Sequence, residues 1–189
     1  MPTVQKIRTL LTCSTLLCGL VACQSTADLD PQPAAAHPTA AVAAASPAAE
    51  PVRVVEERLR VGMVQPFATV VDIDGNSIEM PQTGRRTLLV FFATWCHDSQ
   101  RFMHQLQRSD LLGKIRIIAF GRGESVEALQ RFRAEYKLPI RFVSDPNQTY
   151  YQQVTNQGIP RIILLDEQNN VVKTFLGEIP DALAQVQWP

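Results

Sequence analysis

Cysteine is nearly absent from the body of this chain. Of the four cysteines in 189 residues, three lie within the first 23 positions, and Cys96 stands alone in the remainder. A framework of disulfides inside the main part of the chain is therefore excluded. An excess of charge is also absent, because 18 basic residues balance 18 acidic ones. This balance gives no electrostatic reason to expect nucleic acid as a partner.

The beginning of the chain has the pattern of an export signal. Lys6 and Arg8 precede an apolar run that is short for a membrane span, and we predict a signal peptide over residues 1–22. The run ends in Leu-Val-Ala-Cys, which closely resembles the lipobox of bacterial lipoproteins. The resemblance implies cleavage before Cys23 and attachment of lipid to that residue. By resemblance to Gram-negative lipoproteins, Gln24 implies an anchor in the outer membrane that faces the periplasm.

Residues 23–52 lack aromatic side chains and are rich in alanine and proline. Eleven alanines and five prolines fall between Gln24 and Pro51. The prolines interrupt any long helix that the alanines would favour. We interpret residues 23–52 as a lipid-anchored tether that holds a domain off a membrane. Two alternatives stay open. Residues 1–22 are an ordinary secretory signal or an N-terminal anchor, and the segment after them is a structureless tail whose length has no function.

One apolar run organises the remaining residues, 53–189. Residues 88–93 are apolar without a break, which is typical of a strand that is buried on both faces. Trp95 and Cys96 follow, and a polar stretch then begins a helical pattern. Cys96 is therefore predicted to lie where a central strand ends and a helix begins. At that position the helix dipole and the free N–H groups stabilise a thiolate.

Strand and helix patterns alternate around this run, and Asp74-Gly75 marks the turn of an earlier hairpin. Ser125 is a plausible N-cap for one of the later helices. The order predicts an α/β domain with a central mixed sheet, helices on both faces and an N-terminal β-hairpin extension. The expected strands are residues 67–73, 77–80, 88–93, 115–120, 140–143, 162–165 and 171–175. Four helices are expected: one from Cys96 to about Gly113, one after Ser125, a short one after Asp145-Pro146, and a last one from Pro180 toward Trp188.

Residues 92–96, Phe-Ala-Thr-Trp-Cys, closely resemble the Phe-x-Ala-x-Trp-Cys signature of thioredoxin-fold proteins. The membrane-attached branch related to TlpA and ResA is the best match. The resemblance implies a thioredoxin-like fold in which Gly158-Ile159-Pro160 forms the family's cis-proline loop, with Pro160 against Cys96. It also implies that the backbone of Ile159 pairs with an extended peptide. Trp95 is then expected to be both a wall of the core and a lip of the site.

The second cysteine of the family's Cys-x-x-Cys pattern is missing, because this chain reads Cys96-His97-Asp98-Ser99. A mixed disulfide on Cys96 therefore needs an outside thiol to release it. Ser99 shares a helical face with Cys96, so its hydroxyl is expected to donate a hydrogen bond to the thiolate. A protonated His97 favours the thiolate, and Asp98 disfavours it. The strand before Cys96 also lacks the buried carboxylate of some thioredoxins.

We expect neither a metal nor a cofactor, since His97 and His104 lie about 10.5 Å apart along a helix and cannot share one ion unaided. Three functions stay open. The first, which we favour, is a monothiol thioredoxin-like protein that exchanges disulfides with envelope proteins or small thiols through Cys96. The second is a redox-inactive binding module or adaptor that uses the cis-proline groove. The third is a one-cysteine peroxidase, which Trp95 directly before the cysteine disfavours. The oligomeric state is left open.

Overall fold

The computed structural model describes residues 56–189. The predicted signal peptide 1–22, the lipid-attachment residue Cys23 and the predicted tether 23–52 lie outside the described residues. Within residues 56–189 no helix is both long enough and apolar enough to cross a bilayer. The domain that the sequence predicts from residue 53 onward is thus seen from residue 56.

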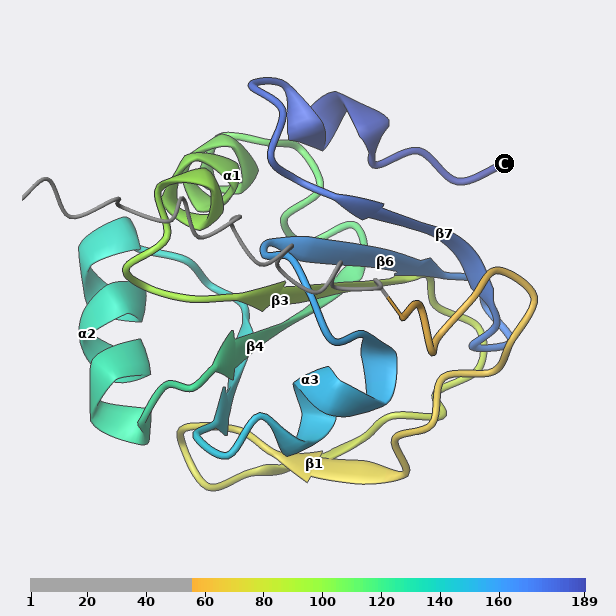
Figure 1. Cartoon of the computed structure of the whole chain (residues 1–189), viewed down its shortest axis with the longest axis horizontal. Helices are drawn as coiled ribbons and strands as arrows, with labels where there is room; N and C mark the ends of the chain where they lie inside the picture. The colour runs from red at the N-terminus through yellow and green to blue at the C-terminus, as the bar shows by residue number, and fades with distance from the viewer. Residues whose placement is uncertain (1–55) are drawn as a thin grey trace, which may run out of the picture. The chain divides into compact units, whose positions relative to one another are not determined.

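Strands and helices alternate along the described chain in the predicted order (Figure 1). A small antiparallel hairpin comes first, and a strand–helix alternation follows it. The elements are β1 (Thr69–Val71), β2 (Ser77–Glu79), β3 (Thr87–Phe92), α1 (His97–Gln107), β4 (Arg116–Arg122), α2 (Val126–Tyr136), β5 (Arg141–Asp145), α3 (Thr149–Val154), β6 (Arg161–Leu165), β7 (Val171–Leu176) and the 3₁₀ helix η1 (Ala182–Gln185).

A five-stranded mixed sheet forms the centre of the domain, with the strand order β5-β4-β3-β6-β7. β3, β4 and β5 run parallel to one another, and β6 and β7 run antiparallel to their neighbours. The carboxyl ends of the three parallel strands therefore meet at one edge of the sheet. This architecture, with its separate β1–β2 hairpin, confirms the fold that the sequence predicts.

β3 lies at the centre of the sheet, and all six of its residues are buried. Leu88, Val90 and Phe92 pack into one core with residues of α1 and α2. Leu89 and Phe91 pack into a second core with residues of the hairpin and α3, on the opposite face of the sheet (Figure 1). Because successive side chains of a strand point to opposite faces, covering both faces requires an unbroken apolar run.

α1 is shorter than the sequence predicts, since it ends at Gln107 rather than near Gly113. The reason is local. The N–H and the hydroxyl of Ser109 both donate to the Leu106 carbonyl, at 3.1 Å and 2.8 Å, and these bonds tighten the last turn and end the helix. Gly113, with φ +81°, lies in the loop that leads to β4.

The last predicted helix is also shorter than expected. Only Ala182–Gln185 is helical, and it is a 3₁₀ turn rather than a helix from Pro180 to Trp188. The indole N–H of Trp188 donates to the Leu165 carbonyl at 2.8 Å. This bond draws the end of the chain along the sheet, so the helix cannot continue.

Candidate active site

Cys96 is the N-cap residue of α1 and follows the end of β3 by one short turn. Its N–H donates to the Ala93 carbonyl at 3.2 Å, and its own carbonyl accepts a hydrogen bond from the Gln100 N–H at 2.9 Å. The side chain is a free, partly exposed thiol. The unpaired N–H groups at the start of a helix point toward its N-cap, so the sulfur lies at the positive end of the α1 dipole.

The predicted proline loop lies against this sulfur. The Ile159–Pro160 peptide bond is cis, and the Cys96 thiol donates to the Ile159 carbonyl over 3.8 Å. The Tyr151 hydroxyl holds the same loop by donating to the Gly158 carbonyl at 3.1 Å. The prediction that Pro160 is cis and faces Cys96 is therefore confirmed.

The side chains beside the sulfur point largely outward. Trp95 is 67 % exposed, so the expectation that it forms part of the core is wrong, and its role at the lip of the site stays a prediction. His97 is exposed as well. Asp98 is paired with Arg101, the two charged groups being 2.6 Å apart. The negative charge of Asp98 is thus balanced by Arg101 on the same helix.

Ser99 does not act as the sequence predicts. Its side chain is fully buried, and its hydroxyl oxygen accepts a hydrogen bond from the Ala93 N–H at 3.4 Å. Among the described residues no hydrogen bond joins Ser99 to the Cys96 sulfur. The hydroxyl instead ties the first turn of α1 to the end of β3, so it holds the loop that carries the cysteine.

His104, the other residue considered for metal binding, packs its ring against Tyr136 with the ring centres 4.6 Å apart. Within residues 56–189 no three His, Cys, Asp or Glu side chains are grouped to hold a metal ion. His97 and His104 therefore stand as two separate side chains on one helix.

Glu124 is a buried acid near the site, and no sequence pattern singles it out. One of its carboxylate oxygens accepts hydrogen bonds from both the N–H and the hydroxyl of Thr94, each at 2.7 Å. The Thr94 carbonyl in turn accepts from the Gln100 side chain at 2.7 Å. Glu124 follows β4, whose carboxyl end lies beside that of β3, and this adjacency is the signal that points to it. It is a positioning residue for the turn that precedes Cys96.

Replacing Glu124 with alanine is expected to lower the free energy of unfolding by about 2 kcal/mol, because charge-assisted bonds to Thr94 are lost. Glu124→Gln retains an oxygen acceptor and should lose roughly half as much. Urea unfolding of both variants measures this difference. The alkylation rate of Cys96 should rise in Glu124→Ala more than in Glu124→Gln; equal rates in both variants and the wild type would contradict a positioning role.

A second buried polar cluster adjoins the proline loop. Arg161, which follows Pro160 directly, is 4 % exposed and pairs with Glu57 at 2.8 Å. Arg122 lies 4.7 Å above the Tyr151 ring. Burial raises the pKa of Tyr151, and the two nearby guanidinium groups partly offset that rise. Glu57 belongs to the segment before the hairpin, so its contact with β6 could not be read from the sequence pattern.

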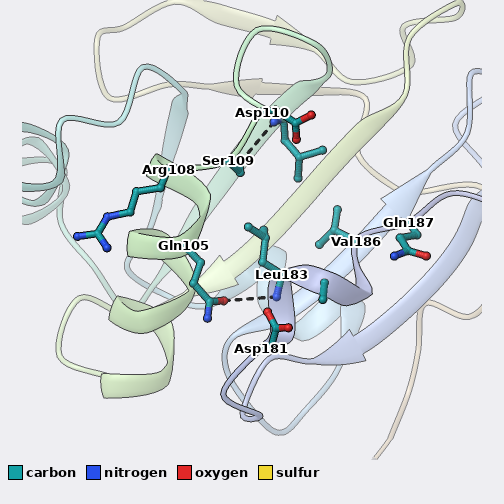
Figure 2. Close-up of a pocket in the computed structure, with 10 residues that line it drawn as sticks. Gln105, Arg108, Ser109, Asp110, Asp181, Leu183, Val186 and Gln187 are labelled. Carbon is teal, nitrogen blue, oxygen red and sulfur yellow. Dashed lines mark hydrogen bonds between the residues drawn. The ribbon is translucent and has the colours of Figure 1, made fainter.

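A hollow of about 490 Å³ lies between the end of α1 and η1, where the Leu183 N–H donates to the Gln105 side chain at 3.4 Å (Figure 2). Charged side chains, among them Arg108 and Asp181, surround it. Its lining includes neither Cys96 nor Pro160. The hollow is therefore a separate feature from the cysteine site.

The "Thioredoxin-like" family model matches residues 84–171, a stretch that contains both Cys96 and Pro160. The thiol-disulfide oxidoreductase ResA of Bacillus thuringiensis (strain Al Hakam) is 26 % identical over 127 residues, which make up 65 % of this chain and 73 % of that protein. Residues 84–171 are thus similar to thioredoxin-like domains, and the chain is similar to ResA. The sporulation thiol-disulfide oxidoreductase A of Bacillus subtilis (strain 168) is 24 % identical to this chain over 111 residues, 56 % of this chain and 67 % of that protein.

Solved structures share the fold of this domain. A candidate protein disulfide isomerase from Bacteroides thetaiotaomicron has a TM-score of 0.62 at 21 % identity, covering 68 % of this chain and 86 % of that chain. A secreted disulfide oxidoreductase of Mycobacterium tuberculosis, described as homologous to DsbE of E. coli, has a TM-score of 0.51 at 15 % identity, covering 57 % and 81 %. At these identities the likeness shows a common thioredoxin-like fold.

Proposed function

We propose that this chain is a monothiol thioredoxin-like protein of the bacterial cell envelope that exchanges disulfides through Cys96. One observation carries the proposal. A partly exposed sulfur lies at the N-cap of α1 and within 3.8 Å of the carbonyl before a cis-proline. The thiolate is the form of cysteine that attacks disulfides, and helix N-termini are a common position for reactive cysteines.

The reaction then needs two separate thiols. The Cys96 thiolate attacks one sulfur of a target disulfide, forms a mixed disulfide with it, and releases the other target sulfur as a thiolate. Ser99 occupies the place of a resolving cysteine, and its buried hydroxyl cannot displace sulfur. A second thiolate, from the target or from a small thiol, must attack the mixed disulfide and restore Cys96.

The envelope location rests on the sequence before the domain. Residues 1–22 have the pattern of an export signal, and Cys23 ends the lipobox-like motif. A lipidated Cys23 would attach the chain to the outer membrane, and residues 24–52 would serve as the tether. Disulfide chemistry suits this location, because thiols outside the cytoplasm meet oxidising conditions.

A binding module without redox chemistry is the second candidate. The N–H of Ile159 has no hydrogen-bond partner within the described residues, so it is available to a strand-like peptide. The exposed ring of Trp95 lies beside the sulfur and offers apolar contact area to the same peptide. Both features would serve a partner equally well if Cys96 never reacted.

The two candidates differ in what happens when the sulfur is removed. The full chain and its Cys96→Ala variant are each used to capture envelope proteins and small thiols without reductant. Partners that appear with the wild type, are released by reductant and are absent with Cys96→Ala support disulfide exchange. Partners that Cys96→Ala captures equally well would replace the redox proposal with the binding module. Failure of Cys96 to react with an alkylating reagent in the folded protein would also refute exchange.

A further inference from the structure

Three arginines from separate segments surround one hollow at the edge of the sheet that carries the amino ends of the parallel strands. The hollow has a volume of about 360 Å³. Arg116 begins β4, Arg141 begins β5, and Arg85 lies in the loop before β3. Cys96 lies beyond the opposite, carboxyl end of β3. Asp74 and the apolar residues Ile115, Ile117, Pro139 and Ile140 also line the hollow.

Arg141 is paired with Asp72, whereas Arg85 and Arg116 have no acidic partner within the described residues. Arg116 donates to three neutral acceptors, namely the Thr87 hydroxyl at 2.9 Å and the carbonyls of Glu79 and Met80 at 2.9 Å and 2.7 Å. Burial lowers the pKa of Arg116, and repulsion from Arg85 lowers it further. Arg85 itself makes no side-chain hydrogen bond or ion pair within the described residues. The charges of Arg85 and Arg116 thus repel each other, and neither has a carboxylate partner within the described residues.

The two carboxylates near the hollow are already engaged. Asp74 accepts hydrogen bonds from both terminal nitrogens of Arg133, at 2.5 Å and 2.8 Å. Asp72 is bound by Arg141 and by the Asn76 N–H at 2.8 Å. Burial raises the pKa of Asp72, but the hydrogen bonds from Asn76 and Arg141 outweigh it and hold the pKa below its ordinary value. Neither acid is therefore free to neutralise Arg85 and Arg116.

We propose that the hollow between Arg85, Arg116 and Arg141 binds a small oxyanion of the phosphate class. Guanidinium groups match phosphate oxygens in paired hydrogen bonds, and a bound anion would relieve the repulsion between Arg85 and Arg116. The contacts of Arg116 with β2 and β3 hold its side chain in place before a ligand arrives. Arg116 is partly buried, and partial burial strengthens the attraction of its charge for an anion.

The test uses the full chain and inorganic phosphate as the probe, with sodium chloride at matched ionic strength as the reference. Isothermal titration calorimetry measures the affinity, and the shift in melting temperature provides a second readout. Arg85→Gln removes a guanidinium that supports no other contact, so the variant should fold normally. Arg131→Gln removes the same charge from the exposed surface of α2 and serves as the matched control.

Arg85→Gln is expected to weaken phosphate binding about tenfold, and Arg131→Gln should change it by less than about twofold. Cys96→Ala should bind phosphate as the wild type does, because the hollow lies at the other end of the sheet. This comparison keeps the anion site separate from the proposed exchange reaction. Phosphate that acts no differently from chloride, or equal losses in Arg85→Gln and Arg131→Gln, would overturn the site.

A phosphate group can come from a free phosphate or from a lipid headgroup. Glycerophosphoglycerol, the water-soluble headgroup of phosphatidylglycerol, is therefore titrated in parallel with inorganic phosphate. Tighter binding of inorganic phosphate that depends on Arg85 supports the site and assigns it to a free dianion. Tighter binding of the phosphodiester that depends on Arg85 supports the site and assigns it to a lipid headgroup.

Discussion

Ser99→Cys is expected to give Cys96 an internal resolving thiol, so that a mixed disulfide formed on Cys96 is released from within the molecule. Position 99 lies in the first turn of α1, three residues after the N-cap Cys96, where the family's pattern has its second cysteine. A thiol there attacks the mixed disulfide from within the same molecule. The lifetime of the mixed disulfide should therefore fall by at least about 100-fold, because an intramolecular thiol acts at a high effective concentration.

The measurement follows decay of a mixed disulfide between Cys96 and a small chromogenic thiol in the full chain without added reductant. Ser99→Ala is the matched control, since it changes the same buried position and adds no thiol; its mixed disulfide should persist as in the wild type. An intramolecular disulfide in Ser99→Cys, seen by mass, should appear as the small thiol leaves. Equal lifetimes in all three proteins would mean that the sulfur at position 99 cannot reach Cys96.

Glu57→Gln is expected to lower the free energy of unfolding by about 3 kcal/mol, since it leaves the charge of Arg161 buried without a counter-charge. The side chain of Arg161 is 5 % exposed, and that of Glu57 is 33 % exposed. One nitrogen of Arg161 and one oxygen of Glu57 already lack a hydrogen-bond partner. The pair therefore has little capacity to compensate for a further loss.

Urea unfolding of the full chain measures this effect. Glu56→Gln is the control, because Glu56 pairs with Arg58 at the surface and should change stability by less than about 0.5 kcal/mol. The double variant Glu57→Leu with Arg161→Met should recover most of the loss, since an apolar pair replaces a buried ion pair at little cost. A small effect of Glu57→Gln, comparable with that of Glu56→Gln, would show that solvent reaches Arg161.

The order of the strands and helices could be predicted from the sequence. The apolar run at residues 88–93 placed the central strand, because only a strand covered on both faces needs such a run. The predicted N-cap at Ser125 is confirmed, as its hydroxyl accepts from the Ala128 N–H at 3.3 Å. The family resemblance implied a cis-proline loop beside Cys96; the structure shows the cis bond at Pro160, and the Ile159 carbonyl before it contacts the Cys96 sulfur.

The features that sequence missed depend on contacts between distant segments. Glu124 reads as one acid in a glycine-rich loop, and only the pairing of β3 with β4 brings it to Thr94. The contact between Glu57 and Arg161 joins residues that lie far apart in the sequence. Ser99 shares a helical face with Cys96, but helical spacing does not fix the rotamer that turns its hydroxyl toward Ala93.

The contacts of the first described residues determine which elements would receive a force applied to the chain before residue 56. The N–H groups of Arg58 and Leu59 both donate to the Val154 carbonyl, at 2.9 Å and 3.1 Å, and Glu57 grips Arg161 beside the proline. Any tension on the chain ahead of residue 56 therefore acts first on α3 and the start of β6. Force applied at residue 56 would therefore be transmitted to the cis-proline loop beside Cys96 before it reached the hairpin. The attachment of the chain and the reactive sulfur are connected through the same contacts.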